Sequence, residues 1–300
     1  MLNMKAAWVC AGWNLKALLK NPKTYLCAIM GFLLCFLLTD KVIALAREYT
    51  TNVQIFEPFI WCFADSDSIL FASLVLMLML TELPRLDAPA AYLIFRTNRA
   101  SWLMGQIMTV IVVSLGYTLF LLLSSMVLCS GTTFFANRWS DTATLLSFSP
   151  QNFEVALQVT RKTVKLTTPY KCTLHICLLM TQYTLFMAAL QLMLTVLRSK
   201  RTGVTAVLTL NLMAYLLTPD RFMTWLNLDK HMRYYANLLS AWLSPLQHAT
   251  YTMHNFGYDL LPTLQATHAL MLGISAAMFV VAFMMMKRHS VDFSGGNEYE

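Results

Sequence analysis

The chain has 300 residues, of which 57% are hydrophobic and only 12% are charged, and its mean hydropathy is +0.55. Soluble proteins carry about 25% charged residues, so this chain lacks the polar surface that a water-soluble particle of its length requires. The composition excludes a disordered chain, a collagen and a disulfide-stapled secreted domain, and it argues against nucleic-acid binding despite a net charge of +7. We therefore expect an all-α integral membrane protein with a single transmembrane domain over residues 1–300.

The first predicted element is a helix over residues 4–20. Trp8 and Leu18 share one face of this helix, whereas Lys5 and Lys16 lie on another. The pattern predicts an interfacial helix, with tryptophan at headgroup depth and lysines toward anionic membrane lipid. A plain cytoplasmic extension of the first span is the alternative. We expect no cleaved signal sequence, because the apolar patch is short and leads into further lysines.

Long gaps between charged residues locate the bilayer-crossing segments, because a helix needs about 20 residues to cross about 30 Å of hydrocarbon. Runs that are apolar on every face do not form surface helices of soluble folds. We predict six transmembrane helices, at about residues 24–45, 67–83, 102–129, 172–197, 203–217 and 264–286.

Residues 234–258 are ambiguous, because they carry no charge but include Pro245 and several Ser, Thr and Asn residues. A seventh span is one interpretation. We favour a re-entrant or interfacial helix pair that is broken near Pro245, since broken backbone at membrane depth is tolerated only where protein or a water cavity covers it.

The distribution of basic residues predicts the orientation. With the N-terminus inside, the inner segments carry 12 of the 22 basic residues and five of the 15 acidic ones. All seven net positive charges then lie on one side of the membrane, in short loops and tails. Six spans with cytoplasmic N- and C-termini satisfy this arrangement, whereas a seventh span would place Lys287 and Arg288 outside.

Ionisable groups are nearly absent from the spans. No Asp, Glu, Lys or Arg occurs in the cores of the third to sixth spans. Such groups are costly at membrane depth and mark function in ion-coupled carriers and membrane enzymes, so we do not expect ion coupling. The candidate residues of a substrate pathway are uncharged: Gln106, Gln182, Gln191 and Asn211. Polar residues in spans tie helices together just as often.

Catalytic and metal-binding motifs are also missing from the sequence. The six histidines form neither HExxH nor HxxxH, and there is no G-x-S-x-G elbow, so we predict no metal site and no catalytic residue. Seven cysteines show no CxxC, and Cys62 and Cys172 either pair on the outer side or remain free thiols. No Walker A motif occurs, so the chain is expected to hold no cofactor, and any ATP must be bound by another polypeptide.

The connection between the second and third spans, Glu82–Arg99, is half apolar. Asp87 suits the N-cap of a short helix, Pro89 its first turn, and Arg96 complements its C-terminal dipole. We expect an amphipathic helix that fills a groove on a partner or lies on lipid. The candidate partner-binding residues are Glu82, Arg85, Asp87, Tyr92, Leu93, Phe95, Arg96 and Arg99.

An N-terminal interfacial helix, six spans, a helical loop at Glu82–Arg99 and a broken segment before the last span together resemble the membrane subunit of an ABC-2-type ATP-binding-cassette exporter. The segment RTNRASWLMGQ, Arg96–Gln106, is similar to the end of that loop in small bacterial permeases of this type. The resemblance implies a bacterial inner-membrane protein whose loop is a coupling helix, seated on a separate ATP-binding subunit that holds ATP and Mg. The extracytoplasmic segment 130–171 departs from the family pattern, and we interpret it as an added outer helix pair.

The resemblance further implies alternating access, in which ATP closes the ATPase subunits and two copies of this chain, or this chain and a paralogue, rock from inward- to outward-open. The Met- and Phe-rich interior suits export of a hydrophobic or amphipathic substrate such as a peptide, a lipid or a drug-like molecule. Two other interpretations are a non-transporting membrane scaffold and a membrane-embedded lipid-modifying enzyme. The enzyme would hold phosphates with Arg161, Lys162, Lys165 and Lys171.

Overall fold

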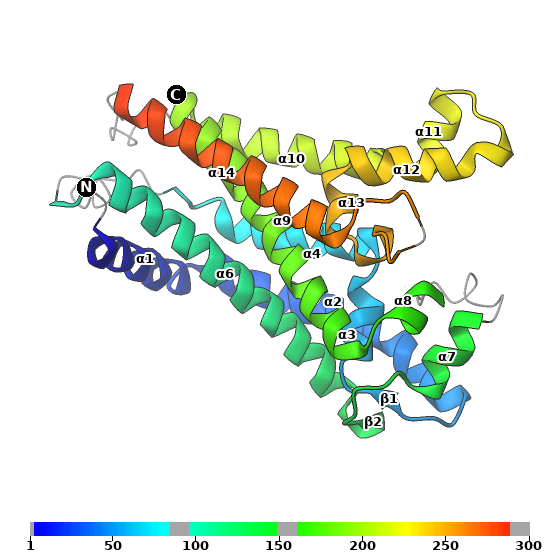
Figure 1. Cartoon of the computed structure of the whole chain (residues 1–300). Coiled ribbons are helices and arrows are strands. Elements are labelled where there is room, and N and C mark those ends of the chain that lie inside the picture. The colour runs from blue at the N-terminus through cyan, green and yellow to red at the C-terminus, as the bar shows by residue number, and fades with distance from the viewer. Residues whose placement is uncertain (1–2, 85–95, 149–160, 258, 289–300) are drawn as a thin grey trace.

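The computed structural model describes residues 3–84, 96–148, 161–257 and 259–288 (Figure 1). The described chain is almost entirely helical. Its strands are β1 (Val53–Gln54) and β2 (Thr133–Phe134), which form one short parallel pair with Val53 opposite Thr133. The predicted all-α class is therefore confirmed.

The helix starts follow from capping residues and prolines. Asn21, Asn98 and Ser199 each accept a backbone N–H as N-caps, and α2, α9, α11 and α13 have proline in the first turn, where its missing N–H is not needed. The helices are α1 (Met4–Leu19), α2 (Pro22–Glu48), α3 (Glu57–Phe63), α4 (Ser66–Leu80), α6 (Arg99–Leu128), α7 (Asp141–Phe148), α8 (Arg161–Leu166), α9 (Pro169–Leu197), α10 (Lys200–Leu216), α11 (Pro219–Trp225), α12 (Arg233–Leu243), α13 (Pro245–Ala249) and α14 (Leu264–Arg288). Short 3-10 turns are η1 (Ser130–Thr132), η3 (Lys230–Met232) and η4 (Tyr251–Met253).

Four helices, α2, α6, α9 and α14, are each long and apolar enough to cross a bilayer. Two bent pairs add to this number only if each pair is one span: α3 and α4 meet at 89°, and α10 and α11 at 77°. By themselves α4 and α10, which match the predicted spans 67–83 and 203–217, have 15 and 17 residues. The described residues thus contain four to six candidate membrane helices and indicate a membrane protein.

Helix α9 lies at the centre of the bundle, between α6 on one side and α14 and α10 on the other (Figure 1). Of its most apolar stretch 61% is buried, against 28% for α2 and for α14. Ile176, Leu179, Tyr183 and Met187 repeat at helical spacing and are all buried. Helix α2 packs on α4 and α6 instead, so the bundle consists of two groups of helices that meet at α6 and α9.

Helix α1 packs along α6 through small residues. A Cβ atom at Gly105 of α6 would lie 2.6 Å from Cys10 Cβ and 3.0 Å from the carbonyl oxygen of Ala7, so the two backbones approach closely. Ala7, Cys10 and Ala11 are buried in this contact, whereas Trp8 is 58% exposed. The predicted helix over 4–20 is therefore present, with its small-residue face on α6.

Between α6 and α9 the chain forms η1, β2 and the short helices α7 and α8, with residues 149–160 outside the described part. The carboxylate of Glu57, at the start of α3, accepts hydrogen bonds from the backbone N–H and the hydroxyl of Ser140, both at 2.6 Å. It also accepts from the backbone N–H of Gln54 at 3.3 Å. These bonds join the segment that contains α7 to the start of α3.

Helices α11 and α12 pack on each other as a hairpin at the right of Figure 1. Helix α12 ends at Leu243 and α13 begins at Pro245, the residue near which the sequence predicts a break in segment 234–258. Tyr235 and Trp242 of α12 are exposed.

Candidate docking face and pathway residues

The starts of α6 and α10 and the end of α14 lie at one end of the bundle, at the left of Figure 1. At this end Glu82, just after α4, forms ion pairs with Lys23 near the start of α2 and with Lys200 at the start of α10, the latter at 3.4 Å. The hydrogen bond from the Lys23 ammonium, together with the charge of Lys200, holds the pKa of the Glu82 carboxyl below its usual value. Glu82 therefore links α4 to α2 and α10.

A second set of contacts between helices lies after segment 85–95, at the start of α6. Arg99, the first residue of α6, donates a hydrogen bond to the carbonyl oxygen of Met286 near the end of α14. The hydroxyl of Ser101, two residues further along α6, accepts the backbone N–H of Asn3 at 2.9 Å. The structure thus ties both described flanks of segment 85–95 to other helices. We refer to these loop-flanking contacts as the loop-anchor cluster, made up of Lys23, Glu82, Arg99, Lys200 and Met286.

The predicted partner-binding residues are only partly described. Glu82 and Arg99 belong to the loop-anchor cluster, and Arg96 is exposed beside it. The helix predicted within Glu82–Arg99 falls largely outside the described residues. So do five of its candidate contacts, namely Arg85, Asp87, Tyr92, Leu93 and Phe95.

We expect Glu82→Gln to lower the free energy of unfolding by less than about 1 kcal/mol, because partly exposed ion pairs contribute roughly 0–1 kcal/mol. The pKa of Glu82 is lowered on folding, so its contribution is present above about pH 4.3 and is lost as the pH falls through the lower folded pKa. Thermal unfolding of both proteins at pH 7 and pH 3 measures the difference. Glu48→Gln, at an exposed carboxylate at the end of α2, is the control. An effect of Glu82→Gln that is as large at pH 3 as at pH 7 would contradict the assignment.

The predicted pathway residues lie on different sides of α9. Gln191 of α9 donates its amide N–H groups to the carbonyl oxygens of Leu80, at 3.1 Å, and Leu83, at 2.7 Å. The carbonyl of Leu80 also accepts the backbone N–H of Leu83 at 2.9 Å. Gln191 thus adds a second donor at the last residue of α4 and supplies one to Leu83, just beyond it. On the opposite side Gln182 contacts His268 of α14, with its Oε1 atom 2.7 Å from Nδ1 of the imidazole.

Asn211 of α10 contacts a third side of α9. Its Oδ1 accepts the hydroxyl of Tyr183 at 2.8 Å, and its amide donates to the carbonyl oxygen of Val207 at 2.9 Å. Like Gln191 and Gln182, Asn211 therefore joins two helices within this chain, as polar residues in membrane bundles often do. Their role in a substrate pathway stays a prediction.

Gln106 and Gln191 are brought together in a small cavity between α4, α6, α9 and α14. The cavity measures about 10 Å³, room for about one water molecule. The buried Oε1 atom of Gln106 has no hydrogen-bond partner among the described residues.

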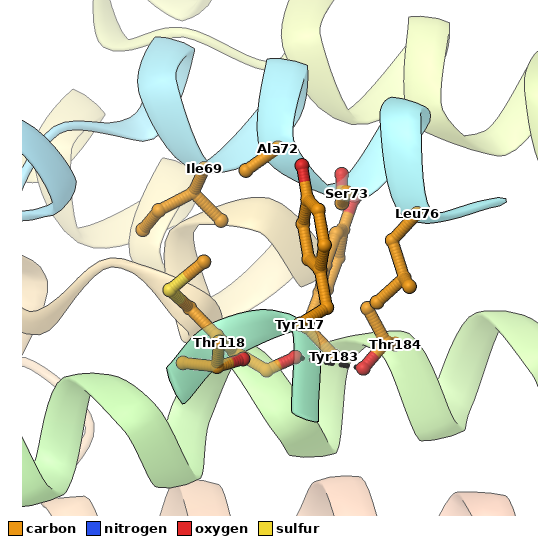
Figure 2. A pocket seen from close by; sticks show the side chains of 9 residues that line it. Ile69, Ala72, Ser73, Leu76, Tyr117, Thr118, Tyr183 and Thr184 are labelled. Carbon is orange, nitrogen blue, oxygen red and sulfur yellow. Dashed lines mark hydrogen bonds between the residues drawn. The ribbon is translucent and has the colours of Figure 1, made fainter. Parts of the chain in front are cut away.

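A second cavity of about 10 Å³ lies between α4, α6 and α9 (Figure 2). The rings of Tyr117 and Tyr183 rise from α6 and α9 toward α4, with Ser73 and Thr184 beside them (Figure 2). Ligand pockets usually measure about 300–1,000 Å³, so neither cavity could hold a transported molecule.

The structure also assembles histidines that are far apart in the sequence. The ring centroids of His175 and His268 are 6.1 Å apart. His248 and His254 both contact the hydroxyl of Thr267, at 3.2 and 3.1 Å. Sequence spacing could not reveal this cluster, because it depends on how α9, α13 and α14 pack. Within the described ranges no group of three or more His, Cys, Asp or Glu is placed to hold a metal ion.

Three of the four basic residues of the alternative phosphate site make contacts with other side chains. Arg161 and Lys165 both lie over the ring of Phe148, at 4.5 and 5.3 Å from its centroid, whereas Lys162 forms an ion pair with Asp259. Arg161 and Lys165 thus make cation–π contacts with one ring, and Lys162 is paired with a carboxylate.

The two cysteines considered for an outer disulfide, Cys62 and Cys172, are both buried free thiols.

No protein-family model matches the chain, and neither a curated protein nor a solved structure matches it significantly.

Proposed function

We propose that this chain is the permease subunit of an ATP-driven exporter of the ABC-2 type, with six spans in the bacterial inner membrane and both termini in the cytoplasm. The observation that supports this function most strongly is the loop-anchor cluster. It binds both flanks of segment 85–95 to α2, α10 and α14, and a coupling loop needs such links in order to move a membrane bundle.

The path of the chain agrees with six spans. The chain leaves the loop-anchor end in α2 and returns to it at Glu82, leaves again in α6 and returns at the end of α9, then leaves in α10 and returns at Met286. These three out-and-back passages correspond to six spans if α3–α4 and α10–α11 each count as one bent span. The positive-inside rule assigns this end to the cytoplasm.

The contacts around the loop suggest how force is transmitted. A partner that displaces segment 85–95 pulls on Glu82 and therefore on α2 and α10, while Arg99 pulls on α14. Gln191 connects the end of α4 to α9. A movement of the loop therefore reaches most of the bundle as a rigid-body shift and not as local bending.

The energy source and the cargo route both require other chains. Without a Walker A motif, this chain depends on a separate ATPase subunit for ATP and Mg. The two cavities of about 10 Å³ cannot pass a molecule, so we place the route between two copies of this chain or between this chain and a paralogue. An apolar route of this kind suits a peptide, a lipid or a drug-like cargo.

The test is copurification with the products of the neighbouring genes, followed by an ATPase assay. We expect a soluble subunit with a Walker A motif to copurify with the chain. Replacing Tyr92 and Phe95 together by Asp should reduce that association at least tenfold, because charged groups at these positions cannot fill an apolar groove. Phe135→Asp, which changes an aromatic residue that is 80% exposed in the segment between α6 and α9, should leave the association unchanged.

Four outcomes would contradict the proposal or a part of it. If the double variant still binds the ATPase, segment 85–95 is not the docking site. If the chain purifies alone and modifies lipid, it is an enzyme; if it purifies alone without activity, it is a scaffold. Labelling of a cysteine introduced at residues 295–300 from outside intact cells would contradict the six-span topology instead.

A further inference from the structure

A threonine hydroxyl joins two buried histidines at the end of the bundle opposite the loop-anchor cluster. Nδ1 of His248 in α13 lies 3.2 Å from Oγ1 of Thr267 in α14, and Nε2 of His254, just after η4, lies 3.1 Å from the same oxygen. The three residues are 3%, 0% and 0% exposed. We name this group the His–Thr–His bridge.

The second nitrogen of each imidazole faces a backbone carbonyl. Nε2 of His248 lies 3.1 Å from the carbonyl oxygen of Trp242, and Nδ1 of His254 lies 3.2 Å from that of Tyr251. A carbonyl oxygen accepts hydrogen bonds but cannot donate them. Each of these two contacts is therefore favourable only if the imidazole nitrogen carries a hydrogen.

The four contacts of the bridge need four hydrogens, one for each. A neutral imidazole supplies one N–H group and a threonine hydroxyl supplies one O–H group, so the neutral bridge has three. Whichever tautomers are chosen, one contact brings two lone pairs together without a hydrogen between them. In a buried site such an unsatisfied contact is unfavourable, because no water replaces the missing bond.

We propose that the His–Thr–His bridge is a proton-binding site that takes up one proton from water and not two. The proton adds to the free lone pair of one imidazole, which becomes an imidazolium, and a hydronium ion is converted to water. The new N–H group donates to Thr267, whose own hydroxyl then donates to the other histidine. A second proton would have no contact left to fill and would meet the positive charge of the first.

Burial disfavours protonation of either histidine, and only the first proton gains a hydrogen bond that compensates for it. Burial lowers the pKa of His254 to about 4 and lowers that of His248, while the carbonyls of Tyr251 and Trp242 act in the opposite direction. The vacant contact favours the first proton beyond these effects. The two imidazoles therefore titrate as a coupled pair.

Other titratable groups lie on the elements that pack around the bridge. Charge on His268 would further disfavour a proton on His254, and the rings of His175 and His268 stack with 6.1 Å between their centroids. Between α3 and α4, the backbone next to Asp65 contacts this segment, since Thr252 donates to the carbonyl oxygen of Ala64 at 3.3 Å. Further groups on these elements are Lys171 and Cys172 on α9, Tyr251 in η4, Tyr234 on α12, and Asp259, which is paired with Lys162.

Uptake of the proton changes how two parts of the chain are joined. His248 and His254 belong to the broken segment that follows α12, whereas Thr267 belongs to α14. The protonated bridge holds the segment on α14 through two good hydrogen bonds, and the neutral bridge holds it through one. The site thus fastens the segment more firmly at lower pH, whether or not the chain works with an ATPase.

The test is a titration of the full chain in lipid nanodiscs, with histidine labelled with 15N and followed by NMR from pH 8 to 4.5. Nitrogen shifts distinguish neutral imidazoles from imidazolium, and His248→Gln and His254→Gln assign the signals. We expect one imidazole of the pair to become charged above pH 5, while the other stays neutral down to pH 4.5. Thr267→Val removes the two central contacts and leaves two N–H groups for two carbonyls, so its proton affinity should fall at least tenfold.

Two controls sharpen the result. Thr267→Ser keeps the hydroxyl and should titrate like the wild type, as should Thr252→Val, which removes another threonine hydroxyl from the same segment. The proposal is wrong if both imidazoles of the wild type stay neutral to pH 4.5, if both become charged, or if Thr267→Val titrates unchanged. If Thr267→Val does not fold, the wild-type titration still decides between these outcomes. None of these measurements depends on an ATPase partner.

Discussion

Gln191→Leu is expected to destabilise the protein by roughly 1–3 kcal/mol, because it removes the side-chain donor of the Leu83 carbonyl and leaves the Leu80 carbonyl with only the backbone N–H of Leu83. Gln191 donates to the carbonyls of Leu80 and Leu83 at the end of α4. Leucine has a similar volume but no donor, and the side chain lies in an enclosed, largely apolar cavity. The end of α4, which leads into Glu82, would lose its attachment to α9.

The change should be visible in two measurements. The midpoint of thermal unfolding in nanodiscs should fall, and ATPase stimulation by the permease, if the proposed partner is present, should fall with it. Gln106→Leu is the matched control, since Gln106 lines the same cavity and its Oε1 atom has no partner within the described part of the chain. Equal destabilisation by both substitutions would show that the hydrogen bonds from Gln191 to the end of α4 are not what stabilises this region.

Gly203→Leu should separate α10 from α9 at a cost of roughly 1–3 kcal/mol or more. A Cβ atom at this position would lie 2.6 Å from Oγ1 of Thr195 and 2.7 Å from the backbone carbonyl oxygen of Gln191. A threonine side chain can rotate, but the backbone oxygen cannot move without the helix. Helix α10 must therefore shift away from α9.

Gly116→Leu provides the comparison, because a Cβ atom at Gly116 of α6 meets nothing within 4 Å. We expect this variant to unfold at or above the wild-type temperature, since replacing a helical glycine reduces the entropy of the unfolded chain. A fall in the unfolding temperature that is equal for the two variants would contradict close packing at Gly203. Gly203 packs directly against the backbone of Gln191. The destabilising effects of substitutions at these two positions should therefore not be additive.

Much of the helical framework could be predicted from charge-free runs. The predicted spans 102–129 and 172–197 differ by three residues or fewer from α6 (Arg99–Leu128) and α9 (Pro169–Leu197). These helices are apolar on all sides, and their ends coincide with capping Asn98 and with Pro169. Local sequence determines such limits, so no knowledge of packing is needed.

Helix α3 and the bend after it could not be predicted in the same way. Glu57–Phe63 is a short buried helix whose carboxylate is satisfied by Ser140, a residue 83 positions away in the sequence. Without that partner a glutamate next to an apolar stretch indicates a loop at the membrane surface. The 89° bend between α3 and α4 depends on such contacts and not on local propensity.

The candidate site residues could likewise be predicted from local sequence, whereas their contacts, which depend on packing, could not. The uncharged polar residues Gln182, Gln191 and Asn211 were identifiable as exceptions in apolar spans, but their partners were not. The His–Thr–His bridge was missed because His248 and His254 are six residues apart, which would place them on different faces of one continuous helix. The chain instead leaves α13 after Ala249 and turns through η4, which brings both imidazoles to Thr267.

The central position of α9 has a consequence for biosynthesis. Helices α2, α4 and α6 are all synthesised before α9 begins at Pro169, yet α4 and α6 bury part of their surfaces against α9. Until α9 is inserted, the surfaces of α4 and α6 that later pack against it are therefore uncovered within the membrane. On that side the hydroxyl of Ser114 in α6 lacks the hydrogen bond that Thr184 of α9 donates to it in the complete fold. We expect chaperones or proteases to have access to this side until α9 packs against it.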